Sequence, residues 1–458
     1  MAQTDQTIDI KSDLLTRRLY ANDASMYQEI PKGVLFPKNE AEIKALVTWC
    51  ADKKVSITPR AAGTSLAGQA TGGGIVMDTS RYMNKILSLN VLSGQATVQP
   101  GVIRDILNME AARHKLQFGP DTSTTNRCMI GGMIGNNSAG SFSLKHRTTR
   151  EHTISIRTVL SDGSIAVFGP ISNAELEAKK SLKNLEGDIY RKMFDLLMQH
   201  KSLIRDSYPH PEITRRNTGY ALDRLCEMEP FTPGGRPFNM AELLTGSEGT
   251  LAMTVDAVIK LVPLPDYKIL LVGQYSTLKE SMVATVEAVK HDTAAVELID
   301  DIIINATKLN IEQSRNRFFI VDEPKAVLIM QFEGDELSEL HKKAGKLAET
   351  LQKMGLGYDY KVITDADEMT RVWELRKAGL GLLMGTWAES RTPEFIEDTA
   401  VRVQDLPDYI EEFEQIMKKY GTHSVYYAHA SVGELHLRPE INLTTRDGLE
   451  TMKKIAVD

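Results

Sequence analysis

The chain has 458 residues and a mass of 51.0 kDa, which is typical of two large domains or about three smaller ones. Apolar residues make up 42% and charged residues 25%, which excludes a disordered or fibrous protein, and the net charge of −7 argues against a nucleic-acid-binding protein. No apolar run reaches the length of about 18 residues that a membrane span needs, and Asp5 and Asp9 interrupt the stretch where a signal peptide has its apolar core. The cysteines at 50, 128 and 226 are too scattered for a zinc ribbon and too few for an iron–sulfur cluster. We therefore expect a reduced, cytoplasmic, acidic protein of enzyme size.

The first half of the chain mixes short strands and helices. Asn39 is expected to cap a helix over 39–54, with Glu42 completing a capping box. Other predicted elements are strands at 55–60, 74–82 and 96–101, a helix at 102–115, and a hairpin over 153–169 that turns at Ser161-Asp162-Gly163. A glycine-rich turn between two strands differs from the strand–glycine–helix order of a Rossmann fold. This pattern predicts an α+β fold rather than a continuous parallel sheet.

The second half begins where two prolines close an apolar run at 261–266, which predicts domains at 1–265 and 266–458. Two strands, at 268–276 and 325–334, are expected to share one antiparallel sheet. Each leads into a long charged helix, and a third strand is expected at 421–429. Residues 444–458 begin an amphipathic helix, so we expect the natural chain to continue past Asp458.

Three segments rich in glycine and hydroxyl side chains indicate a ligand site: PRAAGTSLAGQATGGG (59–74), GPDTSTTNRCMIGGMIGNNSAG (119–140) and TGSEGTL (245–251). Glycine lets backbone amides approach an anion closely, and hydroxyl groups add hydrogen-bond donors. None of the segments matches GxxxxGK(S/T) or GxGxxG, so neither the P-loop nor the Rossmann phosphate site is predicted. One such segment is as well explained by a flexible surface loop. Two long uncharged ones favour a large ligand with a phosphate-rich middle.

In this order and spacing, the three segments resemble the FAD-binding domain of the vanillyl-alcohol-oxidase type. The whole chain is similar to the flavin dehydrogenases of D-2-hydroxy acids, above all to the flavoprotein portion of bacterial D-2-hydroxyglutarate dehydrogenases with a fused iron–sulfur tail. The resemblance implies an α+β fold: an FAD-binding domain of two subdomains, and a cap domain with an antiparallel sheet covered by helices. It also implies these FAD-binding residues: Arg60, Ala61, Ala62, Gly63, Thr64, Ser65, Gly68, Gln69, Pro120, Asp121, Thr122, Gly132, Gly135, Asn136, Ser138, Gly140 and Glu248. Because no histidine precedes His114, we expect the FAD to be non-covalent.

His429 and His436 stand in the stretch YYAHASVGELHLRPEIN. Seven residues apart, they would be separated by about 23 Å on a strand and about 10.5 Å on a helix, too far to share one metal ion. Only a reversal, for which Gly433 is suited, could bring both rings to one ion, and spacing alone leaves two unrelated histidines as the simpler interpretation. The resemblance implies instead that the pair binds a divalent metal, zinc or manganese, beside the flavin.

The chain departs from the family around this pair. Relatives commonly have GDGNLH where this chain has ASVGELH, which places Glu434 near the site, and Arg438 stands where the family often has Asn. An arginine offers a fork of donors suited to a carboxylate. The family's third metal ligand comes from a Gly-Glu-His-Gly-like motif that is absent before Asp458, so we expect this chain to bind metal weakly.

RVWELRKAG (371–379) resembles the family's substrate-binding helix, which implies that Arg376 holds the substrate carboxylate. From the residues alone, it could equally be a solvated arginine on a charged helix. FIEDTAVRV (395–403) resembles the strand that carries Asp398. Asn217 and Tyr220 are weaker candidates near the flavin.

Together these features predict the oxidation of a D-2-hydroxy acid to the 2-oxo acid, with D-2-hydroxyglutarate favoured and D-lactate or glycolate as alternatives. Arg376 and Arg438 would bind the acid, a metal on His429 and His436 would acidify the C2 hydroxyl, and hydride would pass to flavin N5. Electrons would leave through an iron–sulfur tail or a separate acceptor. Two other functions stay open: a flavin-dependent alcohol or aldonolactone oxidase, and a non-catalytic flavin-binding subunit. The oligomeric state is not predicted.

Overall fold

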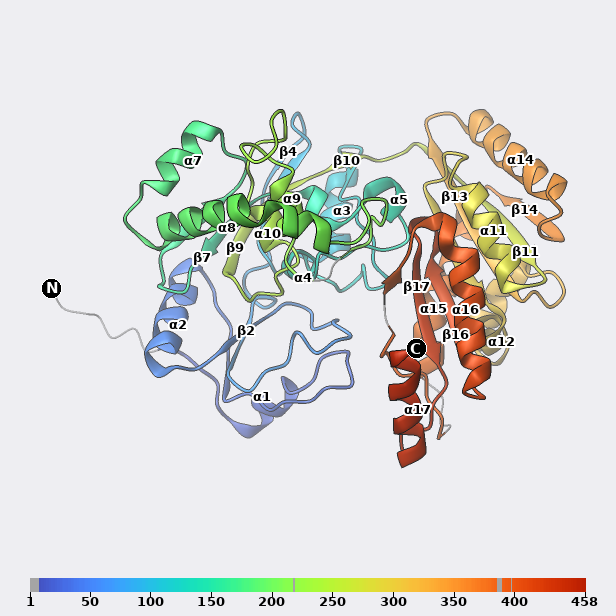
Figure 1. Cartoon of the computed structure of the whole chain (residues 1–458), viewed down its shortest axis with the longest axis horizontal. Helices are drawn as coiled ribbons and strands as arrows, with labels where there is room; N and C mark the ends of the chain where they lie inside the picture. Colours follow the sequence, from blue (N-terminus) through green and yellow to red (C-terminus); the bar gives the residue numbers. More distant parts are fainter. Residues whose placement is uncertain (1–7, 217–218, 385–388, 397) are drawn as a thin grey trace. The chain divides into compact units, whose positions relative to one another are not determined.

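The computed structural model describes residues 8–216, 219–384, 389–396 and 398–458, so the predicted residue Asn217 lies outside the described part (Figure 1). The chain divides into two compact units. The first contains Met1–Ala139, Thr148–Tyr208 and Asn217–Leu264; the second contains Gly140–Arg147, Pro209–Arg216 and Pro265–Asp458. Two short segments from the first half of the chain therefore belong to the second unit. No helix in the described residues combines the length and apolar character needed to cross a bilayer.

The first unit contains three sheets. A parallel sheet has the strand order β1-β3-β2, an antiparallel sheet has the order β4-β5-β9-β7-β8, and β10 pairs with β6. The strands are β1 (Gly33–Leu35), β2 (Ile57–Arg60), β3 (Ile75–Asp78), β4 (Ile86–Asn90), β5 (Gln95–Val98), β6 (Leu116–Gln117), β7 (Thr153–Val159), β8 (Ile165–Phe168), β9 (Met253–Lys260) and β10 (Val262–Pro263). The helices are α1 (Leu14–Leu19), α2 (Glu40–Lys53), α3 (Arg104–Ala112), α4 (Ile130–Asn136), α6 (Thr149–His152), α7 (Asn173–Lys180), α8 (Leu185–Ser207), α9 (Leu222–Cys226) and α10 (Ala241–Leu244).

Several local predictions are confirmed in this unit. Asn39 caps α2 by accepting a hydrogen bond from the amide of Glu42, and the β7–β8 hairpin forms with Gly163 at φ +78°. The predicted capping box is wrong, because the Glu42 carboxylate accepts from the amide of Lys38 rather than from that of Asn39. The Lys38 amide, one residue before Asn39, offers the Glu42 carboxylate an equivalent donor.

The glycine-rich segment 61–74 connects two parallel neighbours, β2 and β3. Parallel strands need a crossover that returns the chain to the starting edge of the sheet, usually through a helix. Here the returning segment has no helix, which leaves its backbone amides outside any helical hydrogen-bond ladder.

The second unit is built on one seven-stranded antiparallel sheet with the order β14-β11-β13-β12-β16-β17-β15. The strands are β11 (Tyr267–Tyr275), β12 (Ala295–Asp300), β13 (Ala326–Gly334), β14 (Asp359–Ile363), β15 (Thr399–Ala400), β16 (Ser424–His429) and β17 (Glu434–Pro439). The helices are α5 (Ser143–His146), α11 (Leu278–Ala288), α12 (Asp301–Leu309), α13 (Ile311–Ser314), α14 (Leu337–Lys353), α15 (Ala366–Met384), α16 (Leu406–Lys419) and α17 (Arg446–Val457), with short 3-10 turns η1 (Arg315–Phe319), η2 (Val403–Asp405) and η3 (Ala430–Val432). The predicted α+β class and the antiparallel sheet covered by helices are confirmed.

The two faces of this sheet pack against different helices. Alternate residues of β11 and β13 join a core with α11, α14, α16 and α17, while the residues between them join a core with α12, α15 and η1 (Figure 1). In β17, Leu435 and Leu437 belong to the first core. Because side chains alternate along a strand, Glu434, His436 and Arg438 must point to the α15 face. This face carries the candidate site.

Candidate functional site

The three glycine-rich segments meet in the first unit. The amides of Glu248 and Gly246 donate to the carbonyls of Gly135 and Ile134, each at 2.8 Å. Gln69 Nε2 lies 3.4 Å from Glu248 Oε1 and links the first segment to the third. A Cβ atom on Gly132 would lie 3.4 Å from the Cβ of Ala61, so the first and second segments are also in contact.

The loop at 61–65 fits a diphosphate. In the described part of the chain, the backbone N–H groups of these five residues have no protein acceptor. Gly63 and Gly68 have φ angles of +67° and +82°, which glycine adopts without strain. The Arg60 guanidinium holds the loop by donating to the carbonyls of Asn22 (2.8 Å) and Ala70 (3.1 Å). A fixed loop with unused amide donors suits the phosphates of a dinucleotide.

The other residues predicted at FAD have structural partners of their own. Arg104 contacts the Pro120 carbonyl at 3.2 Å and the Asp121 carboxylate at 3.5 Å, and Thr122 Oγ1 lies 3.3 Å from Cys128 Sγ. Their role toward FAD stays a prediction. Asn136 donates to Ser138 at 3.3 Å, Tyr220 lies 2.9 Å from Thr250 of the third segment, and Gly140 belongs to the second unit, where it bonds Ser143.

In the second unit, the chain reverses between His429 and His436 as predicted. Strand β16 ends at His429, η3 follows, and β17 pairs antiparallel with β16 so that His436 faces Tyr427. Gly433 makes the turn at φ +72°, and a Cβ atom there would lie 2.0 Å from the Val401 carbonyl oxygen. The reversal brings the two imidazole centroids to 5.3 Å.

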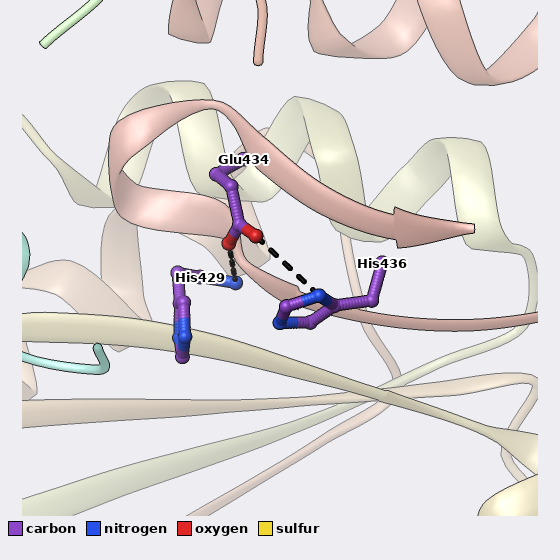
Figure 2. A group of neighbouring side chains, drawn as sticks. All are labelled: His429, Glu434 and His436. Carbon is purple, nitrogen blue, oxygen red and sulfur yellow. Dashed lines mark hydrogen bonds and ion pairs between the residues drawn. The ribbon is translucent and has the colours of Figure 1, made fainter. Parts of the chain in front are cut away.

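Glu434 lies with the two histidines (Figure 2). One possible ligand atom from each of the three side chains lies within 4.8 Å of the others. The Glu434 side chain is completely buried, and burial raises the pKa of its carboxyl group. Two imidazoles and one carboxylate form a donor set that zinc and manganese accept in proteins. The expectation of a third ligand beyond Asp458 stays a prediction.

Two further carboxylates orient the imidazole rings. Both Glu297 oxygens lie near His429 Nδ1, at 2.8 and 3.0 Å, and Asp398 Oδ1 lies 3.1 Å from His436 Nδ1. Burial opposes ionisation of Glu297, but the charges of His429 and Arg376 outweigh it and hold the pKa of Glu297 below its ordinary value. A carboxylate on Nδ1 fixes the tautomer and leaves Nε2 as the ligand atom.

The two arginines predicted to bind substrate have different surroundings. Arg376, on α15, lies 2.8 Å from Glu297 and 5.2 Å from the Tyr427 ring centroid, and its buried Nε has no acceptor in the described residues. Arg438 is 1% exposed; it contacts Glu394 at 2.9 Å and donates to the Tyr427 hydroxyl at 2.7 Å. Arg376 therefore keeps an unused donor, whereas the role of Arg438 toward substrate stays a prediction.

The sequence analysis missed three residues of this cluster: Glu297, Glu394 and Arg215. Arg215 comes from the segment 209–216 and lies 3.7 Å from Asp398, while it also donates to Ser143 at 3.1 Å. For Glu297 a signal existed, since it is the one charged residue inside the apolar run AAVELI (294–299). A charge in a buried strand needs a partner, which marks a site.

Comparisons with known proteins agree with this picture. The FAD binding domain family matches residues 31–169, and the C-terminal domain of FAD linked oxidases matches residues 264–458. The chain is 32% identical over 445 residues to D-2-hydroxyglutarate dehydrogenase of Pseudomonas putida, covering 95% of this chain and 43% of that protein. It is 26% identical to glycolate oxidase subunit GlcD of Bacillus subtilis, covering 96% of this chain and 79% of that one. The chain thus spans less than half the length of the D-2-hydroxyglutarate dehydrogenase that it matches.

Among solved structures, p-cresol methylhydroxylase with substrate bound superposes with a TM-score of 0.66 at 10% identity, over 98% of this chain and 83% of that one. At that identity the likeness concerns the fold alone, and it confirms the predicted vanillyl-alcohol-oxidase-type architecture. The chain thus consists of an FAD binding domain followed by the C-terminal domain of FAD linked oxidases.

Proposed function

We propose that the chain is an FAD-dependent dehydrogenase that oxidises a D-2-hydroxy acid to the 2-oxo acid. D-2-hydroxyglutarate is the favoured substrate, because the relative with 32% identity carries that activity in its name. The observation that carries the proposal is the buried cluster on the α15 face, where Arg376 has an unused donor near the His429 and His436 pair. A carboxylate and the neighbouring C2 hydroxyl need this combination of groups.

FAD, held at the three glycine-rich segments, would supply the hydride acceptor at its N5 atom. The chain's own residues bind and orient the acid. Arg376 Nε would donate to the substrate carboxylate, while the Glu297 contact and the Tyr427 ring keep the guanidinium in place. Fixing the carboxylate and the hydroxyl at two points selects one configuration at C2, because only one enantiomer then presents its hydrogen in the remaining direction.

His429 and His436 would hold a divalent ion, zinc or manganese, which supplies Lewis-acid polarisation of the C2 hydroxyl. The residues fit such an ion, since each ring has a carboxylate on Nδ1 and a buried glutamate lies beside both rings. The rings are poorly exposed, so bulk water has little access to compete with the acid.

Electrons would leave the flavin through a partner, either an iron–sulfur protein segment or a separate acceptor. The three cysteines of the chain are buried free thiols. Free thiols are in keeping with the cytoplasmic location that we propose.

The test is anaerobic reduction of the FAD-loaded protein by a panel of D-2-hydroxy acids and their L enantiomers. We expect D acids to bleach the visible flavin absorbance and L acids to leave it unchanged. Arg376→Lys should raise the acid concentration needed for half-maximal bleaching by about 10-fold or more, because lysine loses the Nε donor of the fork. Flavin that no 2-hydroxy acid reduces, but that a primary alcohol or an aldonolactone does, would overturn the proposal.

A further inference from the structure

The buried cluster on the α15 face contains both arginines and carboxylates. Each arginine there has an acidic partner: Arg376 with Glu297 at 2.8 Å, Arg438 with Glu394 at 2.9 Å, and Arg215 with Asp398 at 3.7 Å. In the described residues, Glu434 has no lysine or arginine within 4.0 Å. It is the carboxylate of this cluster that lacks a permanent positive partner.

Glu434 also has little hydrogen bonding that would stabilise its charge. It is completely buried, and its Oε1 has no hydrogen-bond partner in the described part of the chain. Its Oε2 accepts one long hydrogen bond, from the His429 amide at 3.4 Å, and His436 Nδ1 lies 3.4 Å from Oε1. The Asp398 carboxyl also lies within hydrogen-bonding reach of Glu434. A buried carboxylate in such surroundings is costly unless a cation binds it.

The hairpin directs this carboxylate toward the histidines. Gly433 takes a left-handed conformation, so Glu434 begins β17 directly opposite His429. Glu434 and His436 are two residues apart on one strand and therefore point to the same face. Figure 2 shows the Glu434 carboxylate beside the His429 main-chain amide and the His436 ring.

We propose that Glu434 is the third protein ligand of the divalent ion, so that one hairpin supplies a His–His–Glu set. The inference rests on the proposed function only in taking the histidine pair as metal ligands. Three protein ligands leave an open position for substrate, the arrangement of catalytic rather than structural metal sites. This assignment replaces the expectation that the third ligand lies beyond Asp458.

The test measures Co²⁺ binding to FAD-loaded protein from which a chelator has removed all metal. Calorimetry and the visible absorption of Co²⁺ report the binding. Parent protein should bind one ion. Glu434→Gln should weaken binding by about 100-fold or more and alter the Co²⁺ spectrum, because the variant keeps the shape but loses the anionic ligand. The matched control is Glu440→Gln on the same hairpin, which removes an exposed partner of His423 at 2.9 Å and should leave Co²⁺ affinity unchanged.

Thermal melting gives a second readout. Without metal, Glu434→Gln should melt higher than the parent, since it removes a buried charge; with Co²⁺, only the parent should gain stability. If Glu434→Gln does not fold, Glu434→Asp answers the question, because the shortened carboxylate should weaken binding by about 10-fold or more. Parent-like affinity and spectrum in the variants would overturn the inference, as would a parent that binds no Co²⁺. Flavin reduction by D acids is measured separately, so a failed metal site and a failed dehydrogenase are distinguishable.

Discussion

Glu297→Gln should destabilise the second unit strongly, although it exchanges only one heavy atom. Glu297 is completely buried and compensates Arg376 at 2.8 Å, whose own side chain is 10% exposed. Glutamine keeps the shape but leaves the guanidinium without a counterion. Removing one partner of a buried ion pair costs about 3–5 kcal/mol, and because glutamine retains one acceptor we expect about 3 kcal/mol. For a unit of this size, that corresponds to a fall in melting temperature of about 6–12 °C.

Differential scanning calorimetry of chelator-treated protein at neutral pH measures this difference. The matched control is Glu440→Gln, whose pair with His423 is exposed and should change stability by less than about 0.5 kcal/mol. The pKa of Glu297 is lowered in the folded state, so its contribution is present above the unfolded-chain pKa and is lost as the pH falls through the folded value. The difference in melting temperature between parent and variant should therefore narrow in acid. Equal melting temperatures at neutral pH, or a difference that stays the same in acid, would refute the reasoning.

Three further outcomes are expected. Gly63→Val should abolish FAD binding, measured as the flavin-to-protein absorbance ratio. The new Cβ would lie 2.5 Å from the Arg60 guanidinium, and the backbone there has a φ of +67°. The control Gly234→Val has a similar φ of +75° but no heavy atom within 4 Å of the new Cβ, so it should retain flavin. Burial raises the pKa of Asp300 to about 7 from 3.8, so folding favours its protonated form. The free energy of unfolding should therefore fall by up to about 4 kcal/mol as pH rises from 4 to 7. Chemical denaturation should show that Asp300→Asn loses this pH dependence. Arg438→Met should cost about 3–5 kcal/mol in the same denaturation assay, since it leaves a buried glutamate without its 2.9 Å partner, and a change below 1 kcal/mol would contradict that view.

The elements that could be predicted from the sequence have strong local signals. α2 has a cap and an apolar face within its own residues, and the β7–β8 hairpin has a turn sequence between two apolar runs. β11 and β13 contain the unbroken apolar runs ILLV (269–272) and AVLIM (326–330), the pattern of strands covered on both faces. In each case, the residues that determine the element are its own.

The missed elements carry the site. β17 reads ELHLRP, and its polar side chains face α15, where an ordinary strand of a covered sheet would have apolar ones. The sequence pattern therefore predicts no strand at Glu434–Pro439. β12 was missed for the same reason, since Glu297 interrupts its apolar pattern. Functional side chains weaken the very periodicity from which strands are recognised.

The partners of the site residues could not be predicted because they are distant in sequence. Glu297 and His429 are 132 residues apart, and no local pattern relates them. Arg215 lies in a short segment that joins the second unit from the first half of the chain. The resemblance to a family identified the histidine pair, but only the strand order β12-β16-β17 brings Glu297 beside it.

The β16–β17 hairpin has a consequence for the order of folding. A contact between residues seven positions apart closes a short loop, which forms in about a microsecond or less, whereas pairing β12 with β16 closes a loop of more than a hundred residues and is far slower. The imidazoles can thus approach each other in a chain whose sheet is still open, before Glu297 has fixed their tautomers. Metal added during refolding would then bind weakly at first and tightly only once the sheet has closed. A two-phase Co²⁺ absorption signal in stopped-flow refolding would therefore report when β12 pairs with β16.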